Sequence, residues 1–128
     1  MKHEALTAAL REMAVLPGLR GVAIVESASG LVWQSQGELA DAGALWEAAV
    51  DYWRLHARNQ PHFASLGALR AAVMYHTDSI LAVFRCATEP ELLLVAAGSY
   101  EAVDWKLLQR MTRVVGQTLS TPVTATPA

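Results

Sequence analysis

The 128-residue sequence predicts a single α+β domain in which helices cover both faces of an antiparallel sheet. Segments with helical spacing of apolar residues and segments rich in Val, Ile, Leu and Trp follow one another in the order α-β-β-α-β-β-β-α. The connections within each group of strands are too short for a parallel crossover, so neighbouring strands are expected to run antiparallel. Runs such as VAIV, LAV and LLLVAA are apolar at consecutive positions, as expected when both faces of a sheet are covered.

The first helix and the first two strands have clear boundaries in the sequence. A helix is expected over residues 3–16, because apolar residues recur there at spacings of four and three: Leu6, Leu10, Met13 and Leu16. A Pro-Gly pair then ends it. Residues 19–26 and 31–36 are expected to form a hairpin around Ser-Ala-Ser-Gly, in which Gly30 is free to adopt a positive φ.

A second helix is expected to begin at Asp41, whose carboxylate can cap it, and to end at Asn-Gln-Pro, residues 59–61. Its helically spaced apolar residues are Leu45, Trp46, Ala49, Val50, Trp53 and Ala57. Leu45, Tyr52 and Leu55 widen the apolar surface beyond one stripe. A helix that is apolar over so much of its circumference is expected to contact the core and a second surface.

The C-terminal half predicts three strands and a last helix. The strands are expected over 66–76, 79–86 and 91–97. Ser99 is expected to cap the last helix, whose predicted buried face is Val103, Leu107, Met111, Val114 and Val115. We expect one domain over residues 1–119, followed by a loose Thr/Pro-rich tail over 120–128.

Composition excludes several functional classes. The net charge is −2 and the ten basic residues are dispersed, which argues against a nucleic-acid partner. No uncharged run approaches the roughly 18 residues of a membrane-spanning helix, so no membrane insertion is expected. The N-terminus lacks the continuous apolar stretch of a secretory signal, and the single cysteine, Cys86, can form no internal disulfide. We therefore expect a cytoplasmic protein.

The sequence offers weak candidates for chemistry. His56, His62 and Cys86 are potential zinc ligands, but they lack the spacing of known zinc motifs, and a structural role is favoured. Cys86 falls in a predicted strand, where a buried thiol is more common than a nucleophile. No GxxxxGK[ST] loop for nucleotide phosphates occurs. We expect no catalytic residue, no metal and no cofactor, and hence a protein that is not an enzyme.

The segment LPGLRGVAIVESASGLVWQS, residues 16–35, resembles the signature of the roadblock superfamily, which includes dynein light chains. The shared features are a first helix, a PG-hydrophobic-x-G step, a strand, a tight turn ending in Gly-Leu and a second strand. The order of elements over residues 3–119 is also similar. The chain departs from the family pattern at its hairpin turn, at Trp46 and Trp53, and at the entry to the last helix, residues 98–100, which leaves the subfamily open.

The resemblance implies a roadblock/profilin-like fold with five strands in the order 2-1-5-4-3. The middle helix would cover one face and the terminal helices the other, with the strand over 66–76 at an edge. Roadblock proteins are not known as stand-alone enzymes. They dimerise by pairing this edge and the middle helices, and bacterial members regulate small Ras-like GTPases or act as scaffolds beside them. Independently of the family, an apolar edge strand without proline would invite aggregation unless it were covered.

We therefore expect a non-enzymatic homodimeric module that binds or regulates a small Ras-like GTPase or related signalling partner. The predicted interface residues are Trp46, Val50, Trp53, Ala57, Leu69, Ala71, Val73 and Tyr75. For the two tryptophans, core packing and an interface role remain equally open. Arg54, Arg58 and Arg70 are interpreted as solvated arginines, with an anionic docking surface as the alternative. The alternative function is a small-molecule sensor of profilin or PAS-like architecture, which would need a pocket of a few hundred Å³ with convergent polar groups.

Overall fold

The computed structural model describes residues 2–120 of the chain. Its elements are α1 (Lys2–Ala14), β1 (Leu19–Glu26), β2 (Val32–Gln36), α2 (Gly43–Arg58), α3 (Gln60–Phe63), a 3-10 turn η1 (Ala64–Leu66), β3 (Ala71–Tyr75), β4 (Ile80–Thr88), β5 (Glu91–Gly98) and α4 (Trp105–Ser120). Apart from Ser120, the predicted Thr/Pro-rich tail lies outside the described residues. Within residues 2–120, none of the helices combines the length and the apolar character needed to cross a membrane.

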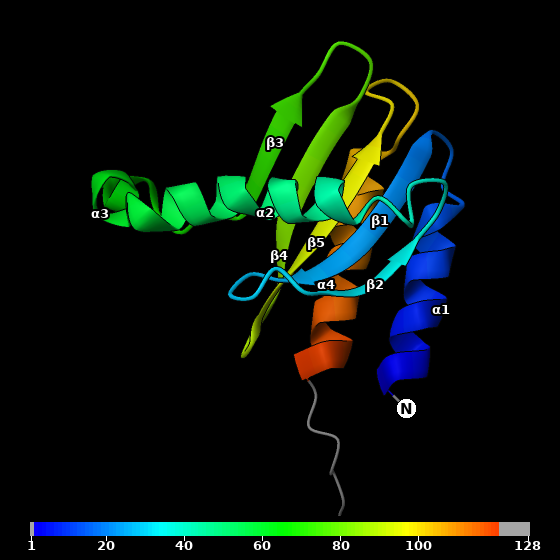
Figure 1. The fold of residues 1–128 in the computed structure, drawn as a ribbon, viewed down its shortest axis with the longest axis horizontal. Coiled ribbons are helices and arrows are strands. Elements are labelled where there is room, and N and C mark those ends of the chain that lie inside the picture. The colour runs from blue at the N-terminus through cyan, green and yellow to red at the C-terminus, as the bar shows by residue number, and fades with distance from the viewer. Residues whose placement is uncertain (1, 121–128) are drawn as a thin grey trace, which may run out of the picture.

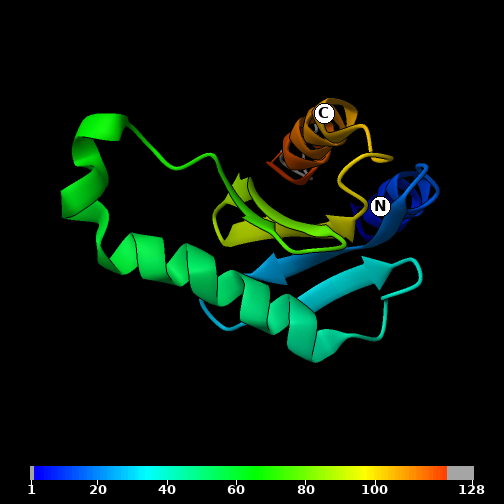
Figure 2. The same cartoon turned by 90° about the horizontal axis from the view of Figure 1, so that it is seen from above.

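The strands form one antiparallel sheet in the order β2-β1-β5-β4-β3. Helix α2 crosses one face of this sheet, and α1 and α4 lie side by side on the other (Figures 1 and 2). The predicted α+β class, the strand order and the distribution of helices between the two faces are therefore confirmed.

Central strand β1 is buried on both faces. Its four consecutive residues 22–25 are all fully buried. Val22 and Ile24 belong to the core beneath α1 and α4, whereas Ala23 and Val25 belong to the core beneath α2. Strand side chains alternate between faces, so a run that is apolar at every position supplies both cores at once. This is the physical reason for the continuous apolar run in the sequence.

Gly21 explains how the largest core residue is accommodated. A Cβ at Gly21 would lie 3.2 Å from the ring of Trp46 and 2.9 Å from the Cβ of Leu39. The small residue at the start of β1 thus leaves room for the indole of α2 to reach the sheet. In the hairpin turn, Gly30 has a φ of +78°, as the sequence predicted.

The starts of two helices differ from the sequence prediction. Helix α2 begins at Gly43 with Ala42 at its N-cap, and no side chain caps it, so Asp41 does not have the predicted role. Helix α4 begins at Trp105 and is capped by Asp104, whose Oδ1 accepts the Leu107 N–H at 3.0 Å. The hydroxyl of Ser99 instead accepts the N–H of Ala102 in the preceding turn. Both predicted caps were wrong. The residues of the preceding loops fit helical spacing as well as a first turn does, so periodicity alone placed both helix starts too early.

The buried face of α4 is also rotated from the predicted one. Val114 is 60% exposed, whereas the buried helix residues are Leu108, Thr112, Val115 and Gly116. A Cβ at Gly116 would overlap the carbonyl oxygen of Cys86, which shows how closely α4 approaches β4. This close approach fixes the rotation of the helix and turns Val114 to the surface.

Strand β3 is shorter than predicted and β4 is longer. The prediction for β3 began at residue 66, but Ala64–Leu66 forms η1 and the strand starts only at Ala71. Pro61 does not end the helical region: it lies at the start of α3, where its missing N–H costs no hydrogen bond. Gly67, with a φ of +87°, then turns the chain back toward the sheet.

Candidate functional site

The inner and outer faces of α2 have different roles. Ala49 and three of the predicted interface residues face the sheet and are buried: Trp46, Val50 and Trp53. The three pack in the core of a single chain, which is the alternative that the sequence left open for the two tryptophans; their predicted interface role stays a prediction. The outer face exposes Tyr52 and Leu55, each by about half. Sequence reasoning noted that these two residues widen the apolar surface but left them out of the predicted site.

The C-terminal part of the helical region projects beyond the sheet. In Figures 1 and 2, the end of α2 and α3 extend past strand β3 into solvent. We call residues 52–66, which comprise the last turns of α2, α3 and η1, the overhang. Its bend is fixed by a stack between the rings of His56 and Phe63, whose centroids are 4.6 Å apart, and by the Asn59 side chain donating to the Leu55 carbonyl at 2.8 Å. The overhang also exposes Leu66 by 80%.

The overhang is attached to the sheet through Glu91. One carboxylate oxygen of Glu91 accepts the hydroxyl of Ser27 at 2.7 Å, and the other accepts the Trp53 indole N–H and the Arg85 Nε, each at 3.3 Å. The Arg85 guanidinium also lies over the Trp53 ring, 5.6 Å from its centroid. Arg54 donates from Nε to the Ser27 carbonyl at 2.8 Å. Residues from α2, β4, β5 and the first hairpin thus hold the point where α2 leaves the sheet.

Strand β3 has an open side. Among residues 2–120 it pairs with β4 alone. The N–H of His76 donates to the Ser79 carbonyl at 2.8 Å, so His76 and Ser79 form a hydrogen-bonded pair next to Tyr75↔Ile80. Antiparallel ladders alternate, so Ala72 and Met74 direct their backbone groups toward β4. The N–H and C=O groups of Ala71, Val73 and Tyr75 therefore point away from the sheet. We call these outward groups the β3 edge.

The three predicted interface residues that lie on β3 do not share a face with α2. Ala71 packs into the core beneath α1 and α4, and alternation places Val73 and Tyr75 on that same face. They are 44% and 69% exposed, and Tyr75 lies against Tyr100 with ring centroids 5.6 Å apart. The strand residues on the α2 face are Ala72 and Met74.

Of the two remaining predicted residues, Ala57 lies within the overhang and Leu69 lies just after it in the chain. Leu69 packs, partly buried, against the core beneath α2, and Ala57 is exposed on α2. The overhang and the β3 edge therefore lie together at one end of the sheet. The edge offers backbone N–H and C=O groups, and α2 exposes Tyr52 and Leu55 there.

The candidates for chemistry are separated or buried. Within residues 2–120, no three His, Cys, Asp or Glu side chains lie close enough to hold a metal ion. The Cys86 thiol is buried beneath α4, and its burial raises the pKa from 9.0 to about 12. At neutral pH the group is therefore a protonated thiol, the less nucleophilic form.

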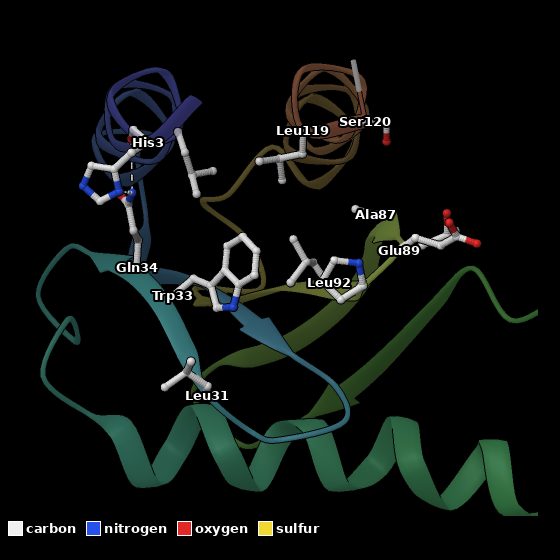
Figure 3. Close-up of a pocket in the computed structure, with 12 residues that line it drawn as sticks. His3, Leu31, Trp33, Gln34, Ala87, Glu89, Leu92, Leu119 and Ser120 are labelled. Atoms are coloured by element: carbon white, nitrogen blue, oxygen red, sulfur yellow. Dashed lines mark hydrogen bonds between the residues drawn. The ribbon is translucent and has the colours of Figure 1, made fainter. Parts of the chain in front are cut away.

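A surface cavity of about 780 Å³ lies between the end of α4, the start of α1 and the first hairpin. Leu31, Trp33, Leu92 and Leu119 give it a largely apolar lining, and Figure 3 shows Trp33 pointing into the space between the two helices. Its polar groups do not converge on a ligand. The Gln34 side chain is bound to His3 and to the Thr7 hydroxyl, and Glu89 points outward (Figure 3). The cavity has the size of a ligand pocket but lacks the oriented polar groups of a specific one.

Comparison with solved structures identifies the architecture. A roadblock/LC7 domain from Streptomyces avermitilis superimposes with a TM-score of 0.72 at 17% identity, over 90% of this chain and 92% of that chain. This chain has the roadblock fold. The resemblance seen in the hairpin sequence is thus confirmed at the level of the fold.

Other solved structures have a similar fold. The gliding protein MglB from Thermus thermophilus gives a TM-score of 0.71 at 17% identity, over 93% of this chain and 88% of that chain. MglC from Myxococcus xanthus gives 0.53 at 16% identity, over 93% and 97%. A further MglB structure, described as having a tetrameric arrangement, gives 0.71 at 18% identity, over 91% and 89%. No protein-family model and no curated protein matches the sequence.

The burial of Cys86 gives a testable prediction. In the folded protein at pH 8, Cys86 should react with a chromogenic disulfide reagent on the order of a hundredfold or more slowly than in urea, because the folded pKa of about 12 leaves little thiolate. Since the folded pKa is the higher one, the free energy of unfolding should also fall as the pH rises above 9. Equal reaction rates in the folded and unfolded protein would show an accessible thiol and contradict this placement.

Proposed function

We propose that this chain is a non-enzymatic homodimeric interaction module that binds or regulates a small Ras-like GTPase or a related signalling partner. One observation carries the proposal: the open β3 edge lies beside an overhang that exposes apolar side chains. An unprotected edge with apolar neighbours is an aggregation hazard in a monomer, and a second copy would remove it. The roadblock fold supports the choice of partner class, because bacterial roadblock proteins are regulators of Ras-like GTPases or scaffolds beside them.

The free energy of apolar burial, compared with the cost of association, favours an interface that uses both the overhang and the β3 edge. Four apolar residues of the overhang are exposed by 36% to 80%: Tyr52, Leu55, Phe63 and Leu66. Completing the burial of one such side chain contributes roughly 1 to 2 kcal/mol, so eight of them in a symmetric dimer would contribute about 8 to 16 kcal/mol. Association costs about 4 to 15 kcal/mol in lost freedom. The apolar contacts alone are thus comparable to this cost, and pairing of the β3 edges supplies the additional stabilisation and the register.

The dimer is tested by removing one outward N–H. Val73→Pro should convert the protein from a dimer near 28 kDa, twice the 13.8 kDa chain mass, to a folded monomer, because proline cannot donate to a partner strand but is tolerated at an edge. Val73→Thr, which keeps the N–H and the β-branched shape, should remain dimeric. Light scattering on a size-exclusion column measures both masses, and circular dichroism checks folding. A wild-type mass near 14 kDa at micromolar concentration would rule out the dimer.

The GTPase partner is tested by affinity capture. The wild-type protein, immobilised and exposed to native cell extract with a GTP analogue or GDP, should enrich a Ras-like GTPase identified by mass spectrometry. Leu55→Glu places a charge on the α2 outer face and should reduce capture by about tenfold or more. The matched control is Val114→Glu, because Val114 is a similarly exposed apolar helix residue on the opposite layer, and it should capture normally. Capture without any GTPase in either nucleotide state would contradict the proposed partner.

A further inference from the structure

A groove on the far side of the sheet from α2 is lined by basic residues. It has a volume of about 470 Å³ and lies between α4 and the segment that leads into β3. Arg70, Arg85 and Arg113 are among its lining residues, although the guanidinium of Arg85 lies on the α2 side over Trp53. None of the described lining residues is acidic. We call it the basic groove. Helix α4 adds to the positive electrostatic potential of the groove, because residues 105–120 include Lys106, Arg110 and Arg113 but no acidic residue.

Two of the three arginines are available to a partner. Arg85 is held by Glu91 at 3.3 Å. The side chains of Arg70 and Arg113 make no hydrogen bond or ion pair with any of the residues 2–120. Arg113 lies on α4 and Arg70 on the segment that leads into β3, and the groove runs between the two. Two unpaired arginine side chains that line one groove favour an anionic ligand that is extended enough to reach both.

The floor of the groove contains an unpaired stretch of strand. Pairing between β3 and β4 stops at Ala71↔Phe84, whereas β4 continues to Thr88 and is paired there only with β5. Cys86, Ala87 and Thr88 all line the groove. Cys86 is the extra residue of a β-bulge and its carbonyl oxygen lies against Gly116 of α4, so Ala87 and Thr88 are the residues left for pairing. Because β3 begins late, the place beside this end of β4 is left without a strand. Such a place can accept an extended peptide that adds to the edge of the sheet.

We propose that the basic groove binds an acidic, extended peptide segment of a partner protein beside residues 87–88 of β4, with its carboxylates on Arg70 and Arg113. The peptide is expected to be acidic because the groove is basic, and to be extended because it would pair with the uncovered end of a strand. A flat anionic membrane would reach the exposed side of α4 but not the strand end within the groove. This site is separate from the β3 edge and the overhang, and it does not depend on the proposed dimer or GTPase.

The test uses the full-length protein and fluorescence anisotropy. The probe is a labelled octapeptide of alternating Glu and Val at low salt, which should bind saturably, and the same peptide with Lys in place of Glu should not bind. Arg113→Glu and Arg70→Glu should each weaken binding by about tenfold or more, because each places like charge against the ligand. Arg11→Glu makes the same charge change on α1 and should leave binding unchanged.

Further measurements separate binding in the groove from dimerisation and from attraction to a membrane surface. Val73→Pro, which tests the dimer, should bind the peptide with unchanged affinity, so failure of the dimer and failure of the groove are distinguishable. An Asp-Pro alternating peptide, equally charged but unable to pair with a strand, should bind at least about fivefold more weakly. Equal binding of both peptides, or insensitivity to Arg70→Glu and Arg113→Glu, would overturn the proposal. Binding of phosphatidylserine vesicles that is abolished by Arg113→Glu, without peptide binding, would also overturn it.

Discussion

The fold depends on burying three central strands on both faces. Strand β1 contributes alternate residues to two separate cores, and β4 and β5 do the same. Two cores require helices on both faces, and the hairpin must therefore be followed by a helix that crosses the sheet. Helix α2 performs this role through Trp46, Val50 and Trp53, and Gly21 provides the space that its largest side chain needs.

The length of the crossing helix generates the candidate interface. A 16-residue helix is about 24 Å long, whereas five strands spaced about 4.8 Å apart span about 19 Å. Helix α2 begins over the sheet on the β2 side and crosses toward β3, so its far end extends past the sheet, as Figure 1 shows. The overhang then sits beside the last strand, and the Glu91 network holds it at a fixed angle. Core packing on one face thus positions an apolar projection next to an open edge.

The sequence predicted local features better than the orientation of surfaces. The hairpin over 19–36 was correct because its turn chemistry and apolar runs are local. The start of β3 was not, because residues 60–66 can form either a strand or a helical turn, and Pro61 is compatible with the first turn of a helix. Helical spacing likewise identified a wide apolar surface on α2 without showing which part faces the sheet. Trp46 faces the core and Tyr52 is half exposed, a difference that helical spacing alone does not show.

We propose that the outward backbone groups of β3 pair with a second copy of the chain. Amide hydrogen exchange resolved by residue tests it directly. At high micromolar concentration the amides of Val73 and Tyr75 should be protected, and dilution should remove their protection while Met74, which directs its N–H toward β4, stays protected. Fast exchange at Val73 and Tyr75 at every concentration, with Met74 protected, would show that the β3 edge remains open in solution and would contradict the account.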